Sequence, residues 1–419
     1  MNQVDVWIED ESLGPSTLVG RLSKAASRTG DTVSFEYDGD WLGGTSPVAV
    51  FPLDPELQLA GGPHFARAGA NALTGAFIDC CPDRWGKRLM DRREAIEARQ
   101  EGRPRRNLRD WDYLVGVHDE GRMGALRLIN PATGHCVDDR ALAAPPITAL
   151  RELEAIADQV ERGEIADDAP EMVQWVRRLV APGASLGGAR PKASFRDPDG
   201  QLWLAKFPSA DDSVDVGLWE FLTYQLSIDA GINMPEARLL SLSQRGHTYA
   251  VRRFDRTPQS RRAYASAMTV LDRTESDGAS YLDLIEAIEV VGASTRIGAD
   301  LEQLFRRVLF NILIGNRDDH LRNHGFLREG DGWQLSPAFD VNPNPHKDEH
   351  VLAIDEADTA PDSGVLLVTA DFYRLTRHTL GPVVEQVRAA VRGWQERARA
   401  LDARGDEIAV MQAVIDPDR

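Results

Sequence analysis

The order of strand and helix signals along this 419-residue chain is the feature that most limits its fold. The opening residues alternate between apolar and polar, which predicts a half-buried sheet. The strands predicted in this part are Val4–Ile8, Thr17–Leu22, Thr32–Tyr37, Tyr113–Val117 and Gly124–Ile129. Ala66–Arg99 has a helical pattern, and Pro131–Pro146 has the composition of a linker. The chain therefore begins with a β-rich module.

Strand and helix signals are mixed in the middle of the chain. Apolar residues recur at helical spacing from Ile147 to Val180, and a glycine-rich stretch follows. A strand pair joined by the turn Asp197–Gly200, a helix that ends at Gly231, and a second strand pair are predicted next. Their ranges are Lys192–Arg196, Gln201–Phe207, Val216–Asp229, Ala237–Ser241 and Thr248–Phe254. From Ala267 onward most segments have helical spacing.

We therefore predict an α+β fold with three domains, which is about the number that a chain of this length forms. The expected domains are a β-rich module at residues 1–137, a mixed α/β lobe at 138–255 and a mostly helical lobe at 256–419. Apolar residues make up 42% of the chain, as is typical of a globular protein that buries sizeable cores.

Charge and cysteine content narrow the classes of function. Lys and Arg number 48 against 66 Asp and Glu, and the net charge of −18 argues against a protein that mainly coats nucleic acid. Cys80, Cys81 and Cys136 are too few for a disulfide framework, which favours a reducing compartment. The N-terminus has no signal-peptide pattern, and the apolar runs are too short to cross a membrane. We expect a cytoplasmic protein.

The most informative segment is Asn311–His324, because it holds Asp318 and Asn323 five positions apart. A short hairpin is predicted after it, with its turn at residues 330–332, and Asp340 follows the hairpin. Phosphoryl transfer needs a carboxylate that accepts the proton of the acceptor hydroxyl, and hard oxygen ligands for Mg²⁺. We expect Asp318 to be this base, and Asn323 and Asp340 to be the Mg²⁺ ligands.

Residues upstream complete this template. Lys206 ends a predicted strand, where a lysine that binds nucleotide phosphates is expected, and Glu220 on the next helix is its candidate partner. The stretch Ser185–Lys192 matches neither the Walker A pattern nor the protein-kinase glycine loop, but its backbone N–H groups can approach phosphates closely. The loop residues expected at the phosphates are Gly187, Gly188 and Ala189.

Five motifs, in this order, resemble the HipA family of bacterial toxin kinases. They are Ser185–Lys192, Lys206–Pro208, Arg253–Arg256, Asp318–Asn323 and Ser336–Asp340. The segments Phe77–Arg88 and Asp112–Gly116 also resemble the N-terminal region of the family, so the resemblance covers nearly the whole chain. Asp319, the pair Arg190-Pro191 and Arg252 depart from the residues usual in the family and favour the broad HipA-like group.

The resemblance implies a two-lobed, protein-kinase-like fold with an added N-terminal β-rich module and a mostly helical C-terminal lobe. It implies an ATP- and Mg²⁺-dependent protein Ser/Thr kinase that is the toxin of a type II toxin–antitoxin system. Such a toxin inhibits growth by phosphorylating a translation component, in this family an aminoacyl-tRNA synthetase. The expected partner is a small helix-turn-helix antitoxin, similar to HipB, through which the protein would reach operator DNA.

The resemblance also implies roles for individual residues. Asp318 matches the catalytic base, Lys206 the ATP lysine, and Arg252–Phe254 the strand that meets adenine. Ser185 matches the serine that the family autophosphorylates, which withdraws the glycine loop and silences the kinase. The expected nucleotide-binding residues are Lys206, Gly187, Gly188, Ala189, Arg252, Phe254, His320, Asn323 and Asp340, with Asn323 and Asp340 also on Mg²⁺.

Alternative interpretations remain for two of these residues and for the function. Ser185 is equally typical of a serine that caps a local turn, and Glu220 of a surface carboxylate on an amphipathic helix. The alternative function is a weak pseudokinase that acts mainly as an antitoxin-bound co-repressor at operator DNA. The intact set of Asp318, Asn323 and Asp340 argues against it.

A metal-dependent hydrolase is a third hypothesis. Its ligands would come from Asp318, Asp319, His320, His324, His346 and His350. This interpretation leaves Asn323, Asp340 and Lys206 without a role, so we favour the kinase and expect His320 to orient Asp318.

Arg84–Arg109 is a basic island in an acidic protein. It is either a contact for nucleic acid or a solvated helix and loop in which Glu94, Glu97 and Glu101 offset the charge. We favour the second interpretation.

Overall fold

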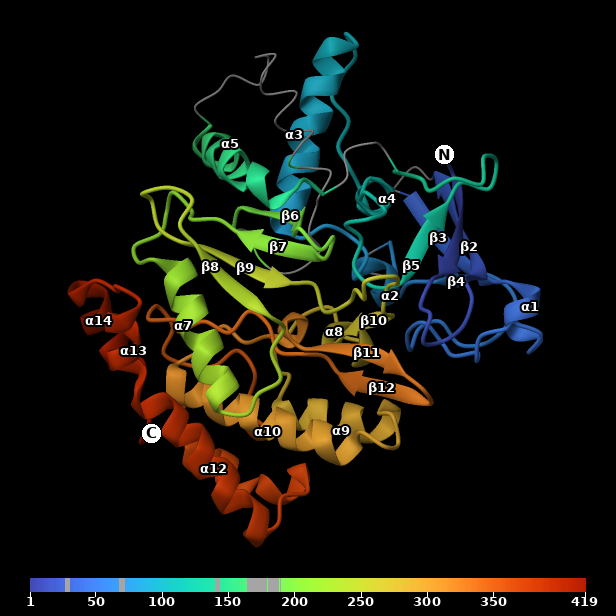
Figure 1. Ribbon diagram of the computed structural model, residues 1–419. Helices are drawn as coiled ribbons and strands as arrows, with labels where there is room; N and C mark the ends of the chain where they lie inside the picture. Colours follow the sequence, from blue (N-terminus) through green and yellow to red (C-terminus); the bar gives the residue numbers. More distant parts are fainter. Residues whose placement is uncertain (27–30, 68–71, 140–143, 164–178, 180–187, 189) are drawn as a thin grey trace. The chain divides into compact units, whose positions relative to one another are not determined.

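The computed structural model describes residues 1–26, 31–67, 72–139, 144–163, 179, 188 and 190–419. Two compact units are present (Figure 1). The N-terminal unit contains residues 1–210 and 252–265, and the C-terminal unit contains residues 211–251 and 266–419. The boundaries of the three domains expected from the sequence remain predictions. In the part of the chain that the structure describes, no helix is both long and apolar enough to span a bilayer.

The N-terminal unit is built on a five-stranded antiparallel sheet with the strand order β4-β3-β2-β1-β5. Its strands are β1 (Gln3–Ile8), β2 (Thr17–Ala26), β3 (Asp31–Tyr37), β4 (His64–Phe65) and β5 (Leu126–Ile129). The alternation in β1 buries Val4, Val6 and Ile8 on one face, as a sheet with one covered face requires. The strands predicted at the start of the chain and after Gly124 are confirmed.

Helices and a second strand pair complete this unit. The helical elements are α1 (Gly39–Leu42), α2 (Gly75–Ile78), α3 (Arg84–Gln100), α4 (Asp110–Val115), η1 (Ile147–Ala149) and α5 (Leu150–Arg162). The strands β6 (Lys192–Arg196) and β7 (Leu202–Lys206) form the predicted hairpin. Its turn is fixed by Asp197, whose side chain accepts hydrogen bonds from the backbone N–H groups of Asp199 and Gln201.

The prediction of a strand at Tyr113–Val117 is wrong, because α4 occupies Asp110–Val115. The carboxylate of Asp112 accepts a hydrogen bond from the Arg109 N–H at 3.1 Å, which satisfies a donor at the helix start. Trp111 and Leu114 are buried three positions apart, on one helical face. The apolar residues here have helical as well as strand spacing, and the start signal decides between them.

A buried aspartate fastens residues 252–265 to the rest of the N-terminal unit. Asp255 is fully buried and accepts hydrogen bonds from Arg253, Arg256 and the Gly124 N–H at 2.6–2.8 Å. Burial by itself raises the pKa of Asp255, but Arg253 and Arg256 outweigh this and hold the pKa well below its usual range. The residues of the Arg253–Arg256 motif thus act as a structural ion cluster.

Several basic residues of the Arg84–Arg109 island make contacts within the same unit. Glu94 on α3 is buried and pairs with Arg103 and Arg106, which both follow the helix. Arg88 and Arg92 donate to backbone carbonyls at the end of α5. The pairing with Glu94 supports the second interpretation, a helix and loop in which interleaved glutamates offset part of the charge.

The C-terminal unit contains most of the helices. They are α7 (Val216–Asp229), α8 (Ala267–Val270), α9 (Tyr281–Val291), α10 (Ile297–Ile314), η2 (Leu321–Asn323), α11 (Ser363–Val368), η3 (Ala370–Tyr373), α12 (Arg377–Arg392), α13 (Trp394–Ala400) and α14 (Gly405–Gln412). The strands β8 (Ala237–Leu240) and β9 (Thr248–Arg252) form one antiparallel pair, and β11 (Gly325–Glu329) and β12 (Gly332–Leu335) form another. The short strand β10 (Tyr264–Ser266) crosses the boundary between the units. The predicted helix before Gly231 and the hairpin before Asp340 are both confirmed.

The central element of this unit is α10, which packs against α9 and α12 (Figure 1). Its second half is buried on all sides, with Val308, Phe310 and Leu313 fully covered. The helix ends at Gly315, whose φ is +69°. This turn leads directly into the segment that carries Asp318.

We predict that Gly315→Ala destabilises the protein by about 2–4 kcal/mol. A Cβ at residue 315 would lie 2.2 Å from Val414 Cγ1 and 3.0 Å from the Val414 carbonyl oxygen, in addition to the cost of a positive φ. The matched control is Gly278→Ala, which has the same φ of +69° but no neighbour within 4 Å, so that about 1 kcal/mol is expected. Urea unfolding measures both; equal losses would contradict the steric argument.

A second prediction concerns acid stability. Hydrogen bonds from Arg103, and then Arg106, lower the pKa of Glu94 from 4.5 to about 2, although burial opposes this. A carboxyl group whose pKa is lower in the folded state stabilises the protein fully above its unfolded value of 4.5 and loses this contribution as the pH falls to about 2. The wild type should therefore unfold at higher urea concentration than Glu94→Gln at pH 6, and the difference should shrink steadily below pH 4.5. A difference that is independent of pH would contradict the assignment.

Candidate active site

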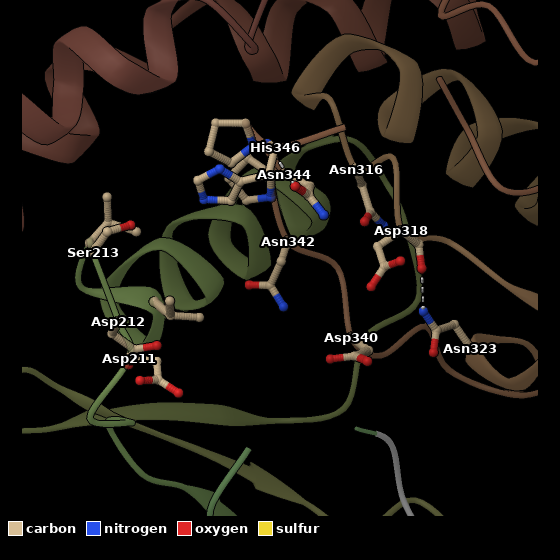
Figure 2. A pocket seen from close by; sticks show the side chains of 14 residues that line it. Asp211, Asp212, Ser213, Asn316, Asp318, Asn323, Asp340, Asn342, Asn344 and His346 are labelled. Atoms are coloured by element: carbon tan, nitrogen blue, oxygen red, sulfur yellow. Dashed lines mark hydrogen bonds between the residues drawn. The ribbon is translucent and has the colours of Figure 1, made fainter. Parts of the chain in front are cut away.

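The residues that the sequence groups around Asp318 line a pocket in the C-terminal unit (Figure 2). The pocket has a volume of about 340 Å³ and contains all three predicted catalytic and metal-binding residues, Asp318, Asn323 and Asp340. Figure 2 shows these three grouped on one side, with Asp211 and Asp212 on another. Residues from three separate stretches of the chain therefore meet at one place.

The loop that presents Asp318 is built on its neighbour, Asp319. The Asp319 side chain is buried, and its Oδ2 accepts from the Tyr281 hydroxyl at 2.7 Å and from Asn311 Nδ2 at 2.9 Å. His324 Nε2 lies 2.8 Å from the same oxygen. Asn311 Oδ1 in turn accepts from Asn316 Nδ2 at 3.1 Å. These contacts tie both ends of the loop to α9 and α10.

Electrostatics keep Asp319 charged. Burial by itself raises the pKa of Asp319, but the adjacent His324 and the hydrogen bonds from His324 and Tyr281 outweigh it, so the pKa lies below its usual range. A buried carboxylate bound in this way has a structural role, because every one of these partners holds the loop in place.

Asp318 has the opposite environment. Its side chain is 56% exposed at the pocket, and its carboxylate pairs with the ammonium group of Lys347. The Asp318 backbone carbonyl accepts from Asn323 Nδ2 at 3.4 Å, which orients the Asn323 side chain. An exposed carboxylate on a fixed backbone can reach a substrate hydroxyl, which is the geometry that a general base requires.

Two amide oxygens in the pocket are buried and lack a hydrogen-bond partner within the described residues, Asn323 Oδ1 and Asn342 Oδ1. Such orphaned acceptors are costly unless a ligand binds them. Together with the Asp340 carboxylate they form a set of hard oxygen donors of the kind that Mg²⁺ prefers. The residues present therefore fit a divalent cation.

The backbone around Asp340 is held in an unusual conformation. Asp340 has a φ of +59°, in the left-handed region that non-glycine residues rarely adopt. The segment is fixed by three hydrogen bonds, from Arg307 Nη2 to the Ser336 carbonyl, from the Ala338 N–H to the Asn233 carbonyl, and from Thr223 Oγ1 to the Val341 carbonyl. Strain that is paid for by surrounding contacts is typical of a functional position.

The remaining predicted residues lie in different parts of the structure. Lys206 is the last residue of β7, and Arg252 is the last residue of β9. Lys206, Arg252 and Phe254 all belong to the N-terminal unit. Gly188 also belongs to that unit and has a φ of +80°. Ser185, Gly187 and Ala189 lie outside the described residues. The nucleotide-binding roles of all these residues remain predictions.

Glu220 lies on α7 in the C-terminal unit and is 3% exposed. The alternative that it is a surface carboxylate is therefore wrong. Burial, with an added contribution from the Glu220 carboxylate, raises the pKa of Tyr249 well above its usual range. Its pairing with Lys206 stays a prediction.

The histidines do not assemble the metal site of the hydrolase hypothesis. Within the described residues, no group of three or more His, Cys, Asp or Glu side chains could hold a metal ion. His324 is engaged by Asp319, and the fully enclosed His350 has its pKa lowered to about 4 by burial. His320 directly precedes η2, and its carbonyl accepts a hydrogen bond from the Asn323 N–H at 2.8 Å, so its backbone orients the loop.

Several pocket residues escaped the sequence analysis. They are Asp211, Asp212, Ser213, Asn342 and Asn344. Lys347, which does not line the pocket but pairs with Asp318, was missed as well. A signal was present in the repeated Asn-Pro pair of Asn342–Pro345, which starts two residues after Asp340. Asp211 and Asp212 precede α7 and carry no motif, so only the folded chain brings them to Asp318.

The same substitution should destabilise the protein to different extents at the two neighbouring carboxylates. Asp319→Asn should destabilise the protein by about 2–4 kcal/mol, because it removes a buried charge that His324 and Tyr281 satisfy. Asp318→Asn should cost less than about 1 kcal/mol, because its ion pair with Lys347 is exposed. Urea unfolding of both variants checks this, and a larger loss for Asp318→Asn would contradict the assignment of roles.

Several curated proteins and solved structures are similar to this chain. "Putative kinase Y4dM" of Sinorhizobium fredii is 30% identical over 157 residues, which cover 34% of this chain and 37% of the relative. A "Putative kinase" of Haemophilus influenzae is 26% identical over 187 residues, and the aligned part covers 54% of that relative. The chain thus spans between about a third and a half of the length of these two curated relatives.

The likeness to HipA proteins is weaker in identity but longer. The serine/threonine-protein kinase toxin HipA of Shewanella oneidensis is 22% identical over 357 residues, which cover 77% of this chain and 72% of the relative. A chain in the solved complex of Shewanella oneidensis HipA, HipB and operator DNA superimposes with a TM-score of 0.65 at 17% identity. It covers 98% of this chain and 94% of that one, so the two share a fold.

These comparisons confirm the fold predicted from the sequence, an α+β kinase-like fold with a β-rich N-terminal part and a mostly helical C-terminal part. Residues 184–401, slightly more than half of the chain, match the family model of the HipA-like C-terminal domain. That range includes every residue of the pocket. The chain therefore belongs to the HipA-like family.

Proposed function

We propose that this protein is an ATP- and Mg²⁺-dependent protein Ser/Thr kinase. The observation that carries the proposal is the meeting of an exposed carboxylate, Asp318, with the unsatisfied oxygen of Asn323 and the carboxylate of Asp340 in one pocket. Phosphoryl transfer needs positioning and charge stabilisation more than covalent chemistry, and these three side chains provide the required groups.

Asp318 is the base in this proposal. It accepts the proton of the substrate hydroxyl while the hydroxyl oxygen attacks the γ-phosphorus, and the buried Asp319 holds the loop at the required place. Asn323 and Asp340 would hold Mg²⁺, which neutralises charge on the phosphates when bound. Pocket carboxylates at four positions would repel a bare nucleotide, which is a further reason to expect the cation.

The other nucleotide contacts follow the family. Lys206 would bind phosphates, with Glu220 as its partner, and Gly187, Gly188 and Ala189 would supply backbone N–H groups. Arg252 and Phe254 would meet the adenine, and His320 would complete the nucleotide site. Autophosphorylation at Ser185 would introduce a dianion beside those amides and silence the enzyme.

The biological role is proposed from the relatives. The names of the similar proteins include a toxin kinase and a complex with HipB and operator DNA. We infer that this chain is the toxin of a type II toxin–antitoxin pair, neutralised by a small helix-turn-helix antitoxin that binds the operator. Its target would be a translation component, of which an aminoacyl-tRNA synthetase is the family-style example.

The test is incorporation of labelled phosphate from ATP and Mg²⁺. The wild type should label itself or an added protein substrate, and Asp318→Ala should lower the rate by about 10²–10⁴-fold. Asp348→Ala, which removes an exposed carboxylate outside the pocket lining, is the matched control and should keep the wild-type rate. A wild type that binds no nucleotide and incorporates no label would refute the kinase.

Two further arms of this experiment separate the finer claims. Mass spectrometry should locate the label at Ser185, and label that persists at the wild-type level in Ser185→Ala refutes that site. Induction of the wild type should arrest growth, whereas induction of Asp318→Ala should not. Equal growth of the two strains would refute the toxin while leaving the kinase in place.

A further inference from the structure

Lys347 contacts the pocket residue Asp318, and the sequence analysis did not anticipate this contact. Its ammonium group pairs with the carboxylate of Asp318, although the two residues are 29 positions apart in the chain. Neither the phosphotransfer motif nor the glycine loop includes this lysine. The folded chain therefore adds a positive charge directly beside the proposed base.

The backbone of Lys347 is fastened to the loop that carries Asp318. Arg317 Nη1 donates to the Lys347 carbonyl, and the Asn344 N–H donates to the Gly315 carbonyl at 2.9 Å. The Asn344 side chain also accepts from the His346 N–H at 2.9 Å. The segment that leads from Asp340 to Lys347 is thus tied to residues 315–317, and the lysine side chain starts from a fixed point.

The side chain itself is held loosely. It is 41% exposed, and its partner Asp318 is 56% exposed, so water competes for both charges. A lysine is a point charge on a flexible four-carbon stem with three donors, and it can exchange one anionic partner for another. The ammonium group can therefore leave Asp318 for a stronger anion that enters the pocket.

The charge of the pocket gives a reason for Lys347 to move from Asp318 to a phosphate. Its described lining residues include four carboxylates, Asp211, Asp212, Asp318 and Asp340, but neither a lysine nor an arginine. A phosphoryl group in transfer carries negative charge on its three equatorial oxygens, and a cation aimed at it is worth several orders of magnitude in rate. Lys347 contacts Asp318, the proposed base, and Asp318 would face the phosphoryl group during transfer.

We propose that Lys347 is a catalytic residue that binds the γ-phosphate of ATP and stabilises it during transfer. This inference rests on the proposed kinase function and deepens it. In the step, the acceptor oxygen forms a bond to the γ-phosphorus while the bond from this phosphorus to the β,γ-bridging oxygen breaks. The hydroxyl proton passes to Asp318 and ADP leaves with the bridging oxygen. Release of Lys347 to the phosphate also frees the Asp318 carboxylate to take that proton.

The γ-phosphate assignment makes a prediction that a structural ion pair does not. Lys347→Met keeps the length of the stem and removes the charge. It should weaken binding of the non-hydrolysable β,γ-imido analogue of ATP about tenfold or more, because a charge-assisted hydrogen bond is lost. Binding of ADP should change less than about twofold, because ADP lacks the γ-phosphate. Isothermal titration calorimetry of the full chain with Mg²⁺ measures both.

Kinetics and two further variants complete the test. Lys347→Met should also lower kcat by about 10²-fold or more, and Lys347→Arg should recover most of the analogue affinity because it restores the charge. Arg377→Met removes an exposed cation at the start of α12 that does not line the pocket, and it should leave both affinities and kcat unchanged. Urea unfolding of Lys347→Met within about 1 kcal/mol of the wild type excludes a folding defect.

The outcomes are distinct. If Lys347→Met alters the affinities for ADP and the analogue equally, or leaves the analogue affinity and kcat unchanged in an active kinase, the γ-phosphate role is wrong and the kinase stands. If the wild type binds neither nucleotide, the proposed function itself fails. Selective loss of analogue affinity together with loss of kcat supports the proposal.

Discussion

The buried carboxylate of Asp319 is the interaction on which the candidate site depends. One oxygen gathers the Tyr281 hydroxyl, the Asn311 amide and the His324 ring within 2.9 Å. An isolated charge in the protein interior is prohibitively costly, so these partners are needed to keep it there and cannot move independently. The loop between α10 and β11 therefore has one stable arrangement, and in that arrangement Asp318 points into the pocket.

Two adjacent aspartates therefore have different roles. Asp319 is enclosed and satisfied, and it gives the loop its rigidity, whereas Asp318 is exposed and available for a substrate. The N-terminal unit uses the same device, since the enclosed Asp255 gathers Arg253, Arg256 and the Gly124 N–H. In both places a buried charge specifies one backbone path by demanding several donors at once. A site placed on such rigid support is preorganised for its chemistry.

Much of the fold followed from local patterns. The alternating strands of the first sheet, the β6–β7 hairpin with its Asp197 turn and the α7 helix before Gly231 all carry complete signals within a few residues. The failure at Tyr113–Val117 came from a run whose apolar spacing suits a strand and a helix equally. There the decision belonged to Asp112, which caps the helix start, and to the burial of Trp111 and Leu114. The environments of Glu220 and Asp255 were not foreseeable, because burial depends on what packs above a residue.

Local sequence patterns were enough to predict the chemistry that we propose, because Asp318, Asn323 and Asp340 are spaced around a hairpin as phosphoryl transfer requires. These motifs are short, and their order along the chain can be read without knowing how the chain packs. The exposure of Asp318 and the burial of Asp319 are visible only in the tertiary structure. The same is true of the negative charge that Asp211 and Asp212 add to the pocket, and of the contact between Lys347 and Asp318. The physical reason is that exposure and charge pairing between distant residues are properties of the packed chain, which no local pattern encodes.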